Sequence, residues 1–200
     1  MRLIVAAGCA IFGYSAHAIR YHQLDFRFLL LLVLTIVISS RVAIKIPRAN
    51  TTITVADSFV FLTLLLYGPE AAVLIAVTDG LSSGLHLSRR WITVLFNAGA
   101  MACAVFITGS IARLLFGSAF SVAREPYSTT LILLCVVAVT QYLAHTWIVA
   151  ICLAGKSERP LWEIWTKHYL WSSLTYFIGA FVAGGIVKLE GSVSFYAVLA

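Results

Sequence analysis

The sequence predicts an all-α membrane protein, a polytopic bundle of about seven to eight transmembrane helices. Its residues are 61% hydrophobic and only 11% charged, whereas soluble domains are about 45–50% apolar and about 25% charged. A soluble domain of this length could not bury so much apolar surface. The apolar residues also fall into runs close to the roughly 20 residues that cross a bilayer. We therefore expect residues 1–200 to form a single integral membrane domain, with no separate soluble domain.

The apolar runs place the expected helices along the chain. They cover residues 3–19, 28–46, 53–67, 70–87, 92–116, 129–154 and 169–188, and a truncated last run begins near residue 195. Segments 53–67 and 70–87 are short and meet at Gly68-Pro69, a pair that breaks helices. These two segments are therefore either two short spans or one re-entrant hairpin.

The N-terminal segment also imitates a secretory signal peptide. Arg2 precedes a short apolar stretch, and Ala16-His17-Ala18 resembles a small-residue cleavage site. We expect the segment to remain as a helix of the bundle, and cleavage is the alternative.

The Lys and Arg residues predict the orientation of the chain. With every segment taken as a span and the N-terminus inside, nine basic residues lie inside and five outside. The inside set is Arg2, Arg41, Lys45, Arg48, Arg89, Arg90, Lys156, Arg159 and Lys167, and the outside set is Arg20, Arg27, Arg113, Arg124 and Lys188. The positive-inside rule then predicts a cytoplasmic N-terminus. The net charge of +6 is spread over short loops, which suits anionic headgroups and excludes a nucleic-acid partner.

Residues 155–168 predict a short amphipathic helix on the membrane surface. Pro160 suits a first helical turn, and Leu161, Trp162, Ile164 and Trp165 recur at helical spacing among charged residues. Tryptophan is enriched at the headgroup level. The predicted membrane-interface residues are Trp91, Trp162, Trp165 and Trp171, and Trp147 is a further belt residue.

Polar residues inside the apolar runs are the candidates for a ligand site. Asp79 lies in the middle of 70–87, and a charge at that depth costs about 2.5–3.5 kcal/mol on insertion scales. We therefore expect Asp79 to face the bundle interior, within reach of residues on later spans. The candidate ligand-binding residues are Asp79, His86, Asn97, Gln141 and His145. Each could instead form an ordinary interhelical hydrogen bond, and Asp57 could be a helix N-cap.

Other residue patterns favour packing over chemistry. Cys9, Cys103, Cys135 and Cys152 form no zinc-binding spacing, so we expect them to be packing residues, with no metal or cofactor. Pairs of small residues four apart predict close helix contacts: Ala6/Ala10, Gly80/Gly84, Ala98/Ala102 and Ala180/Gly184. Motifs such as GxSxG, HExxH and a Walker loop are absent from the sequence. We therefore predict no catalytic residue and no enzyme.

The stretch from Arg41 to Asn97 resembles a known family. It reads RVAIKIP, ADSFVFLTLLLYGPEAAVLIAVTDGLSSGL and RRWITVLFNAGA. It is similar to the bacterial membrane-associated sensor domains that precede HD-type phosphohydrolase or GGDEF domains. The features on which this resemblance rests are Pro47, the Gly68-Pro69-Glu70 break, Phe96-Asn97 and the Trp-rich loop. The break and the Ala6/Ala10 face also resemble the S component of energy-coupling factor transporters.

The first resemblance implies a sensory or anchoring domain in the bacterial inner membrane. It would hold a cytoplasmic output domain of cyclic-dinucleotide type and bind a small molecule. The lipid bilayer is the expected surroundings, and a homodimer is a further expected assembly. Any catalytic domain would lie beyond residue 200, so the metal residues of the phosphohydrolases have no counterpart here. The second resemblance implies the alternative, a substrate-binding subunit of a vitamin or small-molecule transporter with a transport partner.

Overall fold

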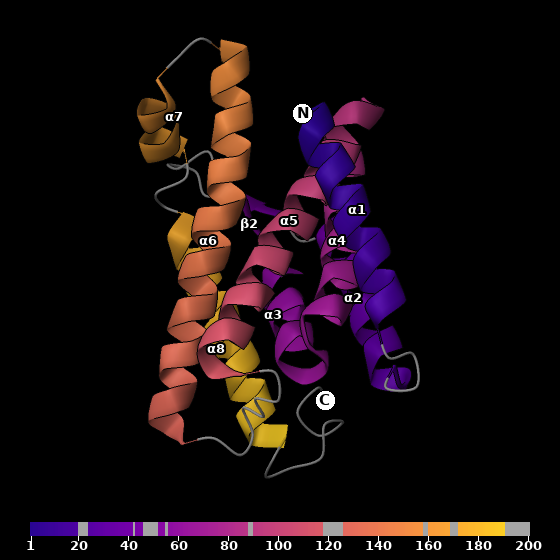
Figure 1. The fold of residues 1–200 in the computed structure, drawn as a ribbon, viewed down its shortest axis with the longest axis vertical. Coiled ribbons are helices and arrows are strands. Elements are labelled where there is room, and N and C mark those ends of the chain that lie inside the picture. The colour runs from indigo at the N-terminus through magenta and orange to yellow at the C-terminus, as the bar shows by residue number, and fades with distance from the viewer. Residues whose placement is uncertain are drawn as a thin grey trace.

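The computed structural model describes residues 1–19, 24–41, 43–45, 52–54, 56–87, 90–117, 126–157, 160–168 and 172–190. Within these ranges the chain forms eight helices and two short strands (Figure 1). They are α1 (Arg2–Ala18), α2 (Phe26–Arg41), β1 (Ala43–Lys45), β2 (Thr52–Thr54), α3 (Ala56–Tyr67), α4 (Pro69–Leu87), α5 (Trp91–Phe116), α6 (Tyr127–Ser157), α7 (Leu161–His168) and α8 (Ser173–Glu190). Each predicted apolar segment up to residue 188 corresponds to one of these helices. The segment predicted from residue 195 lies outside the described residues.

The main correction concerns residues 41–54. The helix predicted for 28–46 ends at Arg41, and the one predicted for 53–67 begins at Ala56. Between them, β1 and β2 pair antiparallel, with Ala43 opposite Thr54 and Lys45 opposite Thr52. The cause is local: β-branched residues crowd this stretch and favour extended backbone. The fold is thus helical with one short β-hairpin ladder.

The break at Gly68-Pro69 is a tight turn between α3 and α4. Gly68 has φ +89°, a left-handed conformation that favours glycine, and Pro69 starts the next helix without a backbone N–H to satisfy. α3 has 12 residues and α4 has 19, roughly 18 Å and 28 Å of helix. α3 is therefore only about half a membrane thickness long.

Helix α5 lies at the centre of the bundle. It packs against α1, α4 and α6, while α8 packs against α3 and α6. Alanine, glycine and valine fill the middle of α5, and most of these residues are buried. The outer helix α6 exposes far more of its surface. The side chains that α5 presents are small, so its neighbours approach its backbone closely.

Glycines create the closest of these contacts. A Cβ added at Gly80 would lie 2.7 Å from the Cα of Ala98, and one added at Gly84 would lie 3.0 Å from the Cα of Val94. The predicted packing role of Gly80/Gly84, Ala98/Ala102 and Ala180/Gly184 is confirmed, since all six residues are buried.

The prediction for Ala6 and Ala10 is wrong, because both are exposed on α1. The contact between α1 and α5 forms instead at Gly8, which sits directly on the backbone of Gly99. Because i and i+4 share one helical face, Gly8 and the Ala6/Ala10 pair face different sides of α1.

Polar contacts join the helix ends at one end of the bundle. Asp25 caps α2, because its Oδ1 accepts the amide of Phe28 at 3.2 Å, and it also accepts the hydroxyl of Tyr67 at the end of α3. The guanidinium of Arg113 makes a bidentate ion pair with the carboxylate of Glu70 at 2.5 Å. These contacts tie α2 to α3 and α4 to α5.

The same contacts set the charge state of Asp25. Burial alone would raise the pKa of this carboxyl, but the Tyr67 hydroxyl, the Phe28 amide and the Arg27 guanidinium together hold the pKa below its ordinary 3.8. Asp25 is therefore an anion at neutral pH, and its cap on α2 is fully formed there.

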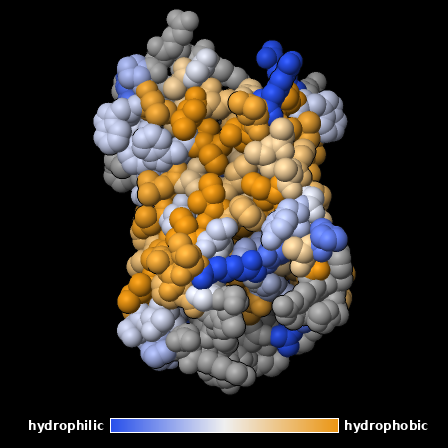
Figure 2. All heavy atoms as spheres, viewed as in Figure 1, coloured by the Kyte–Doolittle hydropathy of each residue, from blue (hydrophilic) through white to orange (hydrophobic). Residues whose placement is uncertain are grey.

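The outer surface of the bundle is strongly apolar. Figure 2 shows a hydrophobic band between two ends where hydrophilic residues gather. Leu29, Ile132, Ile151, Leu174 and Ile178 each expose more than half of their surface. By length and composition, α5 and α6 are long and apolar enough to cross a membrane, and α1, α8 and parts of α2 and α3 are shorter apolar helices.

Candidate functional site

A polar and aromatic cluster joins α5, α6, α7 and α8 inside this apolar bundle. We call it the α6 cluster, and its members are Thr108, Gln141, Tyr142, His145, Thr146, Trp165 and Tyr176. Four of them lie on α6 at positions i, i+1, i+4 and i+5, a spacing that puts their side chains on one side of a helix. The α6 sequence thus directs its polar residues toward neighbouring helices.

Gln141 links α6 to α5. Its side-chain oxygen accepts a hydrogen bond from the hydroxyl of Thr108 at 2.8 Å, and the residue is 1% exposed. Among the described residues, neither its Nε2 nor the buried hydroxyl of Tyr142 has a hydrogen-bond partner. A buried polar group without a partner costs about 1–3 kcal/mol. The α6 cluster therefore holds unused hydrogen-bonding capacity.

His145 links α6 to α8. Its Nδ1 lies 2.7 Å from the hydroxyl of Tyr176. The ring of Tyr142 packs against that of Tyr176, with centroids 5.9 Å apart. Two aromatic rings and an imidazole thus form one wall of the cluster.

Trp165 links α6 to α7. Its Nε1 donates to the hydroxyl of Thr146 at 3.0 Å, while the Thr146 hydroxyl donates to the backbone oxygen of Tyr142 at 2.6 Å. The indole also lies 5.9 Å from the ring of Tyr142 and 5.9 Å from that of Trp147. Trp165 therefore joins α7 to α6.

The residues predicted for the ligand site separate into two groups. Gln141 and His145 belong to the α6 cluster. Asp79 is 6% exposed, as expected for an interior position, and Asn97 is half-buried. His86 is exposed at the end of α4. The side chains of Gln141 and His145 bond to Thr108 and Tyr176, respectively.

Sequence reasoning missed the threonines and tyrosines of the cluster. Thr108, Tyr142, Thr146 and Tyr176 stand in apolar runs, where a threonine hydroxyl can bond to the backbone of its own helix and a tyrosine can pack as an aromatic residue. The signal that could have found two of them is their spacing. Tyr142 and Thr146 each follow directly after a flagged polar residue, at the same four-residue interval.

The predicted interface tryptophans also differ among themselves. Trp91 is 70% exposed and Trp162 is 65% exposed, as residues at a membrane interface would be. Trp165 is half-buried, and its bond to Thr146 points its indole toward α6 instead of outward. Trp171 lies outside the described residues.

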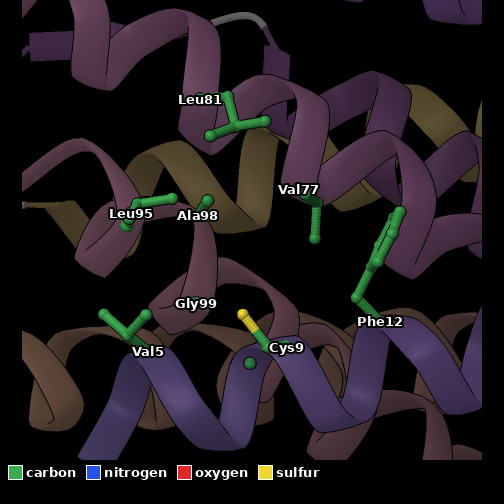
Figure 3. Close-up of a pocket in the computed structure, with 9 residues that line it drawn as sticks. Val5, Cys9, Phe12, Val77, Leu81, Leu95, Ala98 and Gly99 are labelled. Atoms are coloured by element: carbon green, nitrogen blue, oxygen red, sulfur yellow. The ribbon is translucent and has the colours of Figure 1, made fainter. Parts of the chain in front are cut away.

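A separate apolar pocket of about 160 Å³ lies between α1, α4 and α5. In Figure 3, Val5, Cys9 and Phe12 approach it from α1, opposite Val77 and Leu81 of α4. Its lining is apolar apart from the Cys9 thiol.

Cys9 and Cys135 are exposed and Cys103 is buried, so the predicted packing role is confirmed for Cys103 and wrong for Cys9 and Cys135.

Within the described ranges, no group of three or more His, Cys, Asp or Glu residues is placed to hold a metal ion. The chemistry available in the α6 cluster is hydrogen bonding and aromatic packing.

No protein-family model, curated protein or solved structure matches this chain.

Proposed function

We propose that this chain is a multi-pass membrane domain that senses a small molecule and tethers a cytoplasmic output domain at the bacterial inner membrane. The observation that carries the membrane part is the apolar outer surface of the bundle (Figure 2). Soluble monomers rarely expose a contiguous apolar patch larger than a few hundred Å². A bilayer is the environment in which such a surface is stable.

The position of the charged residues supports the same proposal. Arg90 precedes α5 and Arg113 lies in its last turn. At 1.5 Å per residue they are roughly 35 Å apart along the helix, slightly more than the roughly 30 Å hydrocarbon core. Both arginines can then reach headgroup regions while the helix between them crosses the core.

The direction of the helices supports the predicted topology. The N-terminus, the C-terminal end of α6 and the whole of α7 lie at one end of the bundle (Figure 1). These segments carry much of the Lys and Arg excess that predicts a cytoplasmic side. We therefore propose a cytoplasmic N-terminus, with residues 88–91 and 155–168 on the same side.

The α6 cluster is the proposed ligand site. The unpartnered Nε2 of Gln141 is a hydrogen-bond donor inside a low-dielectric bundle. A ligand that presents a neutral acceptor, such as a carbonyl oxygen or a ring nitrogen, would satisfy it without burying an unpaired charge. The aromatic rings beside it supply apolar walls. We propose binding and signalling here, with no chemical reaction.

The topology is the direct test of this function. The four native cysteines are replaced by alanine, and single cysteines are introduced at residues 157 and 188. A membrane-impermeant thiol reagent applied to intact cells should label position 188 and leave position 157 unlabelled. Labelling both positions equally after cell disruption is the control. Strong labelling of position 157 in intact cells would contradict the orientation.

The transporter-subunit alternative is favoured by one observation. Ala6 and Ala10 are exposed on α1, and a small-residue face of this kind lets another helix approach closely in lipid. Leucine at both positions would block such an approach. Ala6→Leu/Ala10→Leu should leave a tethered sensor unaffected, and it would abolish assembly of a subunit that docks through α1. Co-purification of the chain with its transport partner distinguishes the two functions.

A further inference from the structure

The ring of Tyr142 contacts two different helices besides its own. Its centroid lies 5.9 Å from that of the Tyr176 ring on α8. It also lies 5.9 Å from the Trp165 indole on α7. Tyr142 is also 7% exposed, so these contacts are held in a dense interior where small shifts are transmitted to neighbours.

The α8 side of this arrangement belongs to the proposed ligand site. Tyr176 bonds to His145 at 2.7 Å, and Tyr142 itself carries the unpartnered hydroxyl. A ligand that occupies the cluster must therefore touch or displace these groups. Any new hydrogen bond to the Tyr142 hydroxyl fixes the orientation of its ring.

The α7 side is a short helix whose half-buried Trp165 contacts α6. α7 has eight residues, too few for an isolated helix to be stable in water. Trp165 anchors it to α6 through Thr146 and Tyr142, while its neighbour Trp162 is largely exposed and lies 5.5 Å from Trp165. Trp165 therefore contributes to the docking of α7 on α6.

We infer that Tyr142 couples the α6 cluster to α7, so that the binding of a ligand in the cluster is transmitted out of the bundle through α7. This inference rests on the proposed function for the meaning of the signal, but the coupling itself is a property of the unliganded protein. Two discrete positions of the Tyr142 ring, one with Trp165 docked and one with it loosened, would be the element that a ligand biases.

The test measures the fluorescence of Trp165 while the contact between Tyr176 and His145 is changed. The chain is prepared with Trp91, Trp147, Trp162 and Trp171 replaced by phenylalanine, so that Trp165 is the sole tryptophan. The perturbation is Tyr176→Phe, which removes the hydroxyl bonded to His145 and keeps the ring. We expect acrylamide to quench Trp165 about twofold more strongly in this variant.

The same perturbation is then repeated without the coupling ring. In a Tyr142→Leu background, Tyr176→Phe should leave the quenching of Trp165 unchanged. In a Tyr142→Phe background, where the ring is kept, the twofold increase should persist. This second background also serves if Tyr142→Leu fails to fold, as judged by helical circular dichroism and size-exclusion chromatography.

Tyr127→Phe is the matched control, because Tyr127 is exposed at the opposite end of α6 and its change should not reach Trp165. The inference is overturned if Tyr176→Phe does not alter Trp165 while Tyr142 is present. It is equally overturned if the alteration survives in Tyr142→Leu. Because no ligand is used, a failure here does not bear on the topology test, and a failed topology test leaves this result intact.

Discussion

The close packing of α4 on α5 can be tested by adding a single methyl group. Gly80 is buried on α4, and the atoms nearest to a Cβ built there belong to the backbone of Ala98 and Asn97. Backbone atoms within a helix cannot rotate away as a side chain can. Gly80→Ala must therefore push the two helices apart locally.

The size of the effect follows from the geometry. The new Cβ would lie 2.7 Å from the Cα of Ala98, about 0.7 Å short of the 3.4 Å at which ordinary contact begins. Overpacking of this kind costs about 1–3 kcal/mol. Alanine also gains about 1 kcal/mol in helix propensity over glycine, so the comparison needs a control that carries the same gain.

Gly185 on α8 supplies that control, because a Cβ there meets nothing within 4 Å. In detergent or nanodiscs, Gly80→Ala should melt below Gly185→Ala by about 2–12 °C, given roughly 2–4 °C per kcal/mol for a chain of this size. Gly184→Ala should fall between them, because its Cβ would meet only the flexible end of Leu134. Equal melting temperatures for the Gly80 and Gly185 variants would refute the close contact between α4 and α5.

Four further predictions concern charged and aromatic residues. A double-mutant cycle of Glu70→Gln and Arg113→Gln should give a coupling of about 0.5–1 kcal/mol at low salt, and no coupling would mean that their ion pair does not hold α4 to α5. Because the folded pKa of Asp25 lies below 3.8, its stabilising contribution is present above that pH and is lost as the pH falls through the folded value. Thermal melts from pH 6 to pH 2.5 should therefore show a smaller acid loss for Asp25→Asn than for wild type, and identical pH profiles would contradict this. Asp79→Asn should stay folded and melt within about 4 °C of wild type, since an amide still donates and accepts, so a larger loss would show that the charge itself is structural. With Trp162 as the single tryptophan, lipids brominated near the headgroup should quench it more than aqueous iodide does, and the reverse order would place it in water.

The helices were predictable because apolar runs dominate this sequence. Gly68-Pro69 marked the turn between α3 and α4, and the spacing of Leu161, Trp162 and Trp165 marked α7. Both features depend on local chemistry: a helix breaker in the first case and helical periodicity in the second. Local signals of this kind require no knowledge of what a segment packs against.

The β-hairpin was not predicted because its signal is weaker than that of its surroundings. Residues 43–45 and 52–54 sit at the edges of long apolar runs, and short apolar stretches do not distinguish strand from helix by periodicity alone. The β-branched composition was the available clue. Its weight depends on tertiary pairing, which a sequence does not show.

The candidate site was predictable only in part. Gln141 and His145 stood out because amide and imidazole groups are rare in apolar helices, but their partners Thr108 and Tyr176 did not. Which polar residues meet Asp79 depends on the rotation of each helix about its axis, which a sequence does not show.

The short length of α3 affects how water reaches the backbone in this part of the bundle. In a bilayer, this helix of 12 residues would start well inside the hydrocarbon layer, with the β1–β2 ladder leading into it. Among the residues that the structure describes, the sheet has two strands, so one edge of each strand has no partner strand there. Hydrocarbon offers those amides no hydrogen bonds, and irregular backbone at such depth survives only against protein or in a wet cavity. This part of the bundle should accordingly be hydrated from one side of the membrane, and deuterium should reach the amides of β1 and β2 sooner than those of α5.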